Sequence, residues 1–165
     1  MTAGAASAEN APAVPEAMPV YRAPMRSRSA SIPDDGAAVD RAIAQGLVGI
    51  GDRIDGGDAG QRERLARRIA RFADAPDGAL VVTKDARGRL RLGRLAGPYA
   101  RDDSAEAHAV DLVHVRPCTW RAEPLADDEI PSAVRHTFIR GGRNWQRVND
   151  DAAERRLAAV WGRSS

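Results

Sequence analysis

The sequence predicts an α+β protein: a small, strongly bent sheet or partial β-barrel with helices at its rims, behind a disordered N-terminal lead. Three observations support this fold class. The chain has 165 residues, which suits one hydrophobic core and not two large domains. Strand-like runs follow one another between short amphipathic helices, an order typical of α+β folds. The first 33 residues are rich in Ala, Pro and Ser and lack apolar periodicity.

The chain divides into three predicted parts, which are a lead over 1–33, an α+β domain over 34–149 and a C-terminal helix over 150–165. The lead has too few apolar residues to offset the entropy of ordering it. Within the lead, Val20 and Tyr21 are expected to lie extended against the domain, and Met18 is an alternative start of the chain.

The first half of the domain reads as helix, strand and helix. Residues 37–45 repeat apolar positions at helical spacing and end at Gly46, a typical C-terminal cap. Residues 47–51 form a buried strand, whose paired glycines indicate close approach of another backbone or a ligand. After a polar loop over 52–60, residues 61–73 combine an apolar stripe with many arginines, and this helix is expected to pack on a flat surface.

The second half contains most of the sheet. Strands over 79–83 and 90–95 are joined by the turn 85–88 into a hairpin, and a third strand is predicted over 110–115. Pro131 opens a helix that Gly141 and Gly142 end, residues 144–148 are extended and return to the sheet, and Asp150 or Asp151 caps a last helix.

Composition excludes several classes of protein. No apolar run approaches the roughly 18 residues of a membrane span, and the N-terminus lacks the basic start and long apolar stretch of a secretory signal. We therefore expect a cytoplasmic protein without a membrane role. The single cysteine, Cys118, can form neither an intramolecular disulfide nor a zinc knuckle with a second cysteine.

Positive charge is unevenly distributed along the chain. Residues 61–100 carry nine Arg and one Lys against four acids, residues 131–149 carry four Arg and no acid, and residues 101–130 carry eight acids against three Arg. If the two basic segments fold onto one face, they form a footprint for a polyanion. The alternative is that these arginines are ordinary solvated surface.

The order of motifs resembles one superfamily. A strand over Val48–Gly51 and an amphipathic helix are followed by Asp77–Lys84, Arg91–Tyr99 and Val110–Trp120. This order is similar to the EVE/YTH branch of the PUA-like barrels, and most of all to the N-terminal reader modules of modification-dependent restriction systems. The likeness covers about residues 47–120, and residues 131–148 resemble the terminal helix and closing strand.

The resemblance implies a five- or six-stranded barrel whose pocket holds a base flipped out of a nucleic acid, often a modified base. Such a pocket stacks aromatic rings on the base and offers polar groups to its edge. The position after Gly51, commonly aromatic in that branch, is Asp52 here.

Two sets of candidate site residues follow. The segment 140–147 combines guanidinium and carboxamide groups, an aromatic ring and flexible backbone, which suits a phosphate or a base edge; its alternative is a helix stop with a solvated turn. The alternative for Tyr99, Trp120 and Trp145 is that each anchors the core of a small barrel, and this alternative is favoured for any one of them. The predicted ligand pocket consists of Gly49, Gly51, Tyr99, His114, Trp120 and Trp145, and the predicted nucleic-acid contacts are Arg140, Arg143, Asn144 and Gln146.

No catalytic motif is recognisable, so we expect a protein that is not an enzyme and has no cofactor. His108, His114 and Cys118 have spacings compatible with metal ligands, but Pro117 interrupts the run and no carboxylate motif accompanies them, so no metal site is predicted. The leading interpretation is a nucleic-acid-binding module that recognises a modified or flipped base. The alternatives are a protein–protein adaptor that uses the Arg-rich helix, and a sensor of a free nucleotide.

Overall fold

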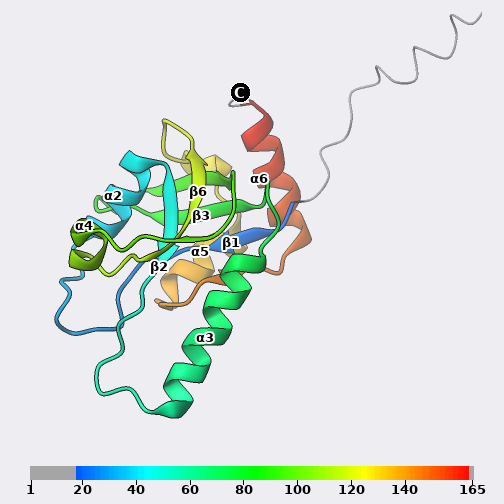
Figure 1. Cartoon of the computed structure of the whole chain (residues 1–165). Helices are drawn as coiled ribbons and strands as arrows, with labels where there is room; N and C mark the ends of the chain where they lie inside the picture. The colour runs from blue at the N-terminus through cyan, green and yellow to red at the C-terminus, as the bar shows by residue number, and fades with distance from the viewer. Residues whose placement is uncertain (1–17, 164–165) are drawn as a thin grey trace, which may run out of the picture.

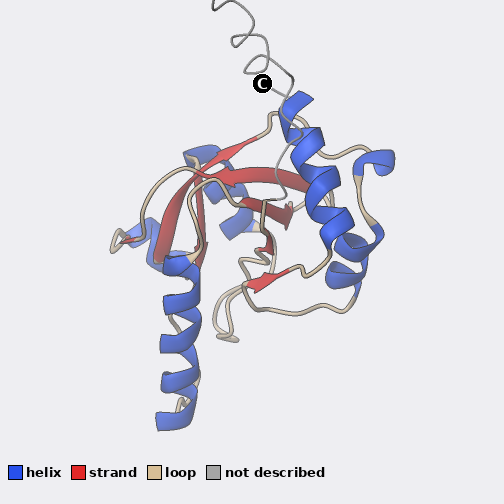
Figure 2. Cartoon of the chain, turned by 90° about the vertical axis from the view of Figure 1, so that its right-hand side faces the viewer, coloured by secondary structure: helices blue, strands red, loops and turns tan. Residues whose placement is uncertain are grey.

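The computed structural model describes residues 18–163 and contains one strongly curled mixed sheet with helices at its rims (Figures 1 and 2). The predicted fold class is confirmed. The strands are β1 Val20–Arg22, β2 Leu47–Ile50, β3 Leu80–Lys84, β4 Leu90–Leu95, β5 Ala100–Arg101, β6 His114–Trp120 and β7 Gln146–Arg147. The helices are α2 Ala37–Gln45, α3 Ala59–Asp74, α4 Ala105–Ala109, α5 Ser132–Ile139 and α6 Asp151–Arg163, with a 3-10 turn at Asp127–Glu129.

The sheet runs in the order β2-β6-β4-β3-β1-β7, with β5 paired to β6. The predicted hairpin is present, since β3 and β4 pair antiparallel from Leu80↔Arg94 to Lys84↔Leu90. The extended segment 144–148 returns to the sheet as predicted, because β7 pairs antiparallel with β1. The predicted helix ends also hold: Gly46 closes α2 in a left-handed conformation, and the Asp150 carboxylate accepts a hydrogen bond from Ala153 N at the start of α6.

Residues 18–33 of the predicted lead are ordered in the structure, including the stretch around Val20 and Tyr21 that was expected to lie against the domain. Strand β1 lies inside the sheet, parallel to β3 and antiparallel to β7, and Val20 and Ala23 are 0% and 1% exposed. The expected extended placement of Val20 and Tyr21 against the domain is confirmed, and the long-range pairing stabilises this short strand. The remainder of the predicted lead, residues 1–17, lies outside the described residues.

The predicted strand over 110–115 is also wrong in position. Residues 110–111 form a turn after α4, with Asp111 at φ 51°, and β6 starts only at His114. The strand then includes Pro117, although the sequence predicted that this proline interrupts the run. Pro117 is tolerated because its carbonyl accepts from Ala96 N, directly after β4, and its nitrogen, which lacks a hydrogen, faces the gap between the end of β4 at Leu95 and the start of β5 at Ala100. The short elements α4 and β5 were not predicted.

The sheet has apolar packing on both faces. Along β3, Val81 contacts one core cluster, which includes Val48 and Phe72, while Leu80 and Val82 contact a second cluster that receives α6. This alternation follows from the two-residue period of a strand. No described helix is both long enough and apolar enough to cross a membrane.

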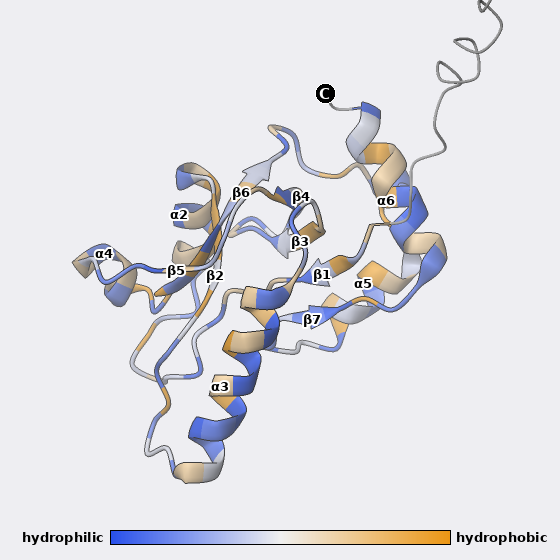
Figure 3. Cartoon of the chain, turned by 45° about the vertical axis from the view of Figure 1, so that its right-hand side comes forward, coloured by the Kyte–Doolittle hydropathy of each residue, from blue (hydrophilic) through white to orange (hydrophobic). Residues whose placement is uncertain are grey.

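Helix α3 does not lie on the sheet as predicted, but projects from the body (Figures 1 and 3). Of its apolar stripe only Phe72 is buried, while Leu65 and Ile69 are half-buried. Asp58 and Gln61 form a capping box at its N-terminus. Its C-terminus is held by the buried Arg116, whose guanidinium donates to the carbonyls of the last turn.

Candidate functional site

Four of the predicted pocket residues lie together at one end of the sheet. His114 starts β6 opposite Ile50, Gly49 pairs with Val115, and Tyr99 immediately precedes β5. The Tyr99 hydroxyl lies 2.7 Å from His114 Nδ1, and the two rings are stacked with centroids 5.8 Å apart. Gly51 closes the group next to the loop that follows β2. This end of the sheet therefore carries a preformed aromatic and polar pair.

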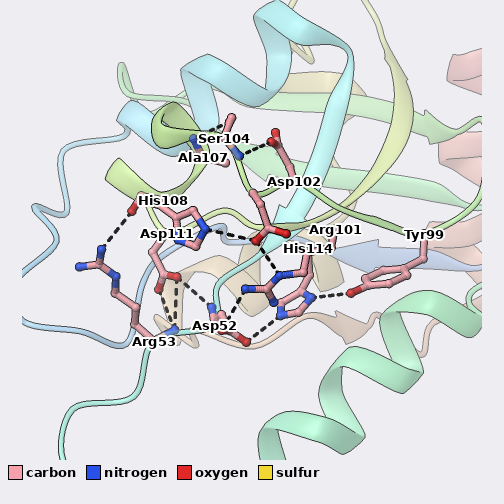
Figure 4. A network of polar contacts seen from close by, with 11 residues as sticks. Asp52, Arg53, Tyr99, Arg101, Asp102, Ser104, Ala107, His108, Asp111 and His114 are labelled. Atoms are coloured by element: carbon pink, nitrogen blue, oxygen red, sulfur yellow. Dashed lines mark hydrogen bonds and ion pairs between the residues drawn. The ribbon is translucent and has the colours of Figure 1, made fainter.

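Asp52 completes this pair (Figure 4). Its Oδ1 lies 2.8 Å from His114 Nε2, so both ring nitrogens of the 4%-exposed histidine have partners. The residue that departs from the aromatic of the EVE/YTH-like pattern is thus a carboxylate that orients His114. Arg101 lies close to the same carboxylate, with Nη2 3.8 Å from Asp52 Oδ2.

The two glycines are required by close contacts, as the sequence predicted. A Cβ on Gly49 would lie 2.6 Å from the carbonyl oxygen of His114, and a Cβ on Gly51 would lie 2.5 Å from Asp111 Oδ2. Asp111 is itself buried, and its carboxylate accepts from the backbone N–H of Asp52 and Arg53 and from the Ser27 hydroxyl. This carboxylate ties the loop after β2 to the N-terminal segment, a role that sequence reasoning missed.

The structure does not bring Trp120 to the other pocket residues. It lies at the far end of β6, six residues from His114, which in an extended strand is about 20 Å. Its Nε1 donates to Leu47 O at 2.8 Å and its ring packs over Gly93, where a Cβ would be 2.6 Å from Trp120 Cε3. Trp120 therefore anchors the barrel wall, which is the core alternative considered for it.

Trp145 lies in a third place. It is 4% exposed, stacks on Tyr21 with ring centroids 4.7 Å apart and meets Phe72 edge to face at 4.9 Å. These contacts make Trp145 a core residue, whose ring packs against Tyr21 and Phe72 and not in a pocket with Tyr99 and His114. Its Nε1 is nevertheless buried without a hydrogen-bond partner among residues 18–163.

The predicted contact segment 140–147 is fastened by a residue that the sequence did not reveal. Buried Arg22 donates to Thr137 O, to Asn144 O and to Gln146 Oε1. Burial, and secondly the charge of Arg140, lower the pKa of the Arg22 guanidinium. Arg140 itself is exposed.

The remaining polar groups of this segment are only partly free. The Asn144 side chain accepts from Arg28, and exposed Arg143 donates to Ser27 O at 3.2 Å. Gln146 is held by Arg22, so it is a weaker candidate for direct ligand contact than Arg143.

A narrow groove of about 30 Å³, rich in arginine, lies beside Trp145 and the loop after β2. It runs between α3, the segment 24–28 and the end of the 140–145 loop. Its lining is Pro24, Met25, Arg26, Arg28, Ile50, Gly51, Arg53, Leu65, Arg68, Asp111, Arg143, Asn144 and Trp145. We call this feature the basic groove.

Most arginines of the basic groove make no ion pair with an acid of the described chain. Arg26 is paired with Asp34, but Arg28, Arg53, Arg68 and Arg143 make no ion pair within the described chain. Burial, and then the charges of Arg28, Arg71 and Arg64, lower the pKa of the Arg68 guanidinium. Mutual repulsion of this kind is relieved by an anion, so the groove is electrostatically suited to a polyanion.

Two larger hollows lie elsewhere on the surface. One of about 580 Å³ also borders Trp145 and is lined by Tyr21, Arg71, Gln146 and Arg147, together with Asp74. The other, about 550 Å³, is lined by Asp34, Asp35 and Asp85 as well as Lys84. The acids make this second hollow a poor place for a polyanion.

Within the described residues, no group of three His, Cys, Asp or Glu side chains could hold a metal ion. Cys118 is buried, and burial raises the pKa of its thiol to about 12. It therefore lacks the thiolate character of a nucleophile at neutral pH.

Comparison with known proteins gives a likeness among solved structures alone. No family model matches the chain, and no curated protein matches it. Among solved structures it is similar to the YTH domain of the Zygosaccharomyces rouxii MRB1 protein, solved in complex with N6-methyladenosine RNA, with 12% sequence identity, a TM-score of 0.49 and 94% of each chain covered. A functional assignment therefore depends on this chain's own side chains.

Proposed function

We propose that the chain is a non-catalytic nucleic-acid-binding module that holds a strand against the basic groove. The observation that carries the proposal is a set of four groove arginines that make no ion pair within the described chain: Arg28, Arg53 and Arg143 from three loops, and Arg68 from α3. Arg64 and Arg71 continue the positive charge along α3. Neutralising several phosphates with such a surface releases counterions and supplies most of the affinity for a nucleic acid.

We propose further that the module recognises a modified or flipped base close to the basic groove. His114 is paired with Ile50, which lines the basic groove, and directly paired residues of an antiparallel ladder project from the same face. A nucleic-acid strand held in the basic groove would thus pass near the Tyr99–His114 pair. The half-buried Tyr99 ring offers an aromatic surface, and the Asp52–His114 contact fixes the polar partner behind it.

A protein–protein adaptor is the second candidate, because α3 projects from the body with Leu65 and Ile69 half-buried. An acidic partner could contact the same arginines. The two functions differ in ligand: the adaptor binds an acidic protein and has only nonspecific attraction to nucleic acid.

The test is fluorescence anisotropy with labelled single-stranded and duplex DNA and RNA, with and without modified bases, at about 50 and 150 mM salt. The proposal predicts saturable binding at the higher salt, with affinity that falls steeply as salt rises. An unlabelled acidic polypeptide serves as competitor. No binding to any oligonucleotide at either salt, or complete displacement by the polypeptide at equal charge concentration, would overturn the proposal.

A further inference from the structure

The wall of the basic groove contains a buried hydrogen-bond donor without a partner. Trp145 lines the groove, is 4% exposed, and its Nε1 makes no hydrogen bond within residues 18–163. By contrast, the indole of Trp120 donates to Leu47 O. Buried donors are nearly always paired, so an unpaired one calls for an acceptor supplied by a ligand or by solvent.

The groove is too small for a base. Its volume of about 30 Å³ has room for a few water-sized groups, since one water needs roughly 10–15 Å³. Ordinary pockets for drug-sized ligands measure roughly 300–1,000 Å³. The oxygens of a single phosphate fit this scale, and the flat ring of a purine or pyrimidine does not.

Cations line the same groove from three elements. Arg68 belongs to α3, Arg28 to the N-terminal segment and Arg143 to the loop before β7. The one carboxylate in the lining, Asp111, already accepts hydrogen bonds from two backbone N–H groups and the Ser27 hydroxyl. An anion in the groove therefore meets a neutral donor and three guanidinium groups, against one carboxylate whose oxygens are engaged.

We propose that this point of the groove seats one backbone phosphate of a single-stranded nucleic acid, with the Trp145 Nε1–H donating to a phosphate oxygen and Arg28, Arg68 and Arg143 balancing its charge. The inference rests on the proposed function and specifies it. Phosphate contacts fix the register of a strand and carry no sequence information. The groove thus positions the nucleic-acid strand, and recognition of a base takes place outside the groove.

The experiment follows the indole N–H resonances of the full chain in ¹⁵N–¹H NMR spectra. The variant Trp145→Phe keeps an aromatic ring against Tyr21 and removes the donor, and it assigns one of the three tryptophan signals. If that variant does not fold, Trp120→Phe and Trp161→Phe assign the signal by elimination. The probes are inorganic phosphate, a uridine decamer and the same decamer with an uncharged methylphosphonate backbone.

The Trp145 signal is expected to shift with inorganic phosphate and with the decamer but not with the uncharged decamer, while the Trp120 signal stays in place. Trp145→Phe should weaken binding of the decamer about tenfold, the effect of one lost hydrogen bond to a charged group, without changing the salt dependence. Arg68→Gln should lower the slope of log affinity against log salt by about 0.7.

The outcomes separate this inference from the proposed function. If the decamer binds but neither moves the Trp145 signal nor distinguishes Trp145→Phe, the phosphate seat is refuted and the nucleic-acid function stands. If phosphate moves the signal and the decamer does not bind, the groove binds a free anion, and both the backbone-phosphate seat and the nucleic-acid function are refuted. A signal that shifts equally with the uncharged decamer would show contact with a base or sugar and would also overturn the seat.

Discussion

Replacing Arg116 by Gln should loosen α3 from the sheet. The Arg116 side chain is 2% exposed, and its guanidinium donates to Phe72 O at 3.0 Å, Ala75 O at 2.5 Å and Gly97 O at 3.0 Å. The last carbonyls of a helix have no partners within the helix, and a cation there is favourable. Arg116 is thus both the C-terminal cap of α3 and its link to β6.

The size of the effect follows from these contacts. Three hydrogen bonds from a charged donor at about 1.5 kcal/mol each give roughly 4.5 kcal/mol. Water can reach part of the helix end once the side chain is gone, so a loss of about 3 kcal/mol in the free energy of unfolding is expected. For a chain of this size each kcal/mol lowers Tm by about 2–4 °C, which gives a fall of roughly 6–12 °C.

The matched control is Asp77→Asn. Asp77 lies 2.8 Å from Arg116 Nη2, but its side chain is 71% exposed, and an exposed ion pair contributes no more than about 1 kcal/mol. Thermal unfolding followed by far-ultraviolet circular dichroism compares the two variants with the parent. If Asp77→Asn lowers Tm as much as Arg116→Gln, or if Arg116→Gln lowers it by less than about 2 °C, the capping account is refuted.

Three further predictions concern other buried contacts. Gly142→Ala should destabilise the fold by about 1–3 kcal/mol in urea unfolding, because a Cβ would overlap the Arg22 guanidinium that fastens the 140–147 loop; an unchanged midpoint would show that Arg22 moves freely. Cys118, whose thiol pKa burial raises to about 12, should react with a thiol reagent near pH 8 only after unfolding, and rapid labelling of the native protein would contradict this. Burial alone would raise the pKa of Asp85, but hydrogen bonds from Arg89 hold it below its ordinary value of 3.8, so its contribution to stability is present at neutral pH and lost as pH falls through the folded-state pKa. Asp85→Asn should therefore be less stable than the parent near pH 7, and the difference should shrink as pH falls below the ordinary value of 3.8; a constant difference would be inconsistent with this charge.

Local signals predicted most of the fold. The glycine cap at Gly46, the hairpin turn over 85–88 and the helix opened by Pro131 depend on residues close in sequence, and each lies where it was expected. The errors concern elements that long-range contacts decide. Strand β1 exists because β3 and β7 pair with it, and β6 passes through Pro117 because two different strands share one of its edges.

The candidate site was predictable in part for the same reason. The glycines of β2 pointed to a close contact, and Tyr99 and His114 are adjacent in the structure. Trp120 was wrongly grouped with them, because the sequence does not show that His114 and Trp120 lie at opposite ends of the same strand. The meeting of Arg28 with Arg68 depends on how the N-terminal segment folds over α3, and only the excess of arginine in residues 61–100 hinted at it.

The most direct test of the account compares salt dependence of nucleic-acid binding in two variants of equal charge. Arg68→Gln/Arg143→Gln removes two arginines of the basic groove, and Arg87→Gln/Arg155→Gln removes two exposed arginines that make no ion pair in the described chain. For a single-stranded oligonucleotide the groove variant should lose about 1.4 from the slope of log affinity against log salt, while the control keeps the parent slope. Equal losses in both variants would show that net charge and not the groove binds the nucleic acid, and would contradict the account.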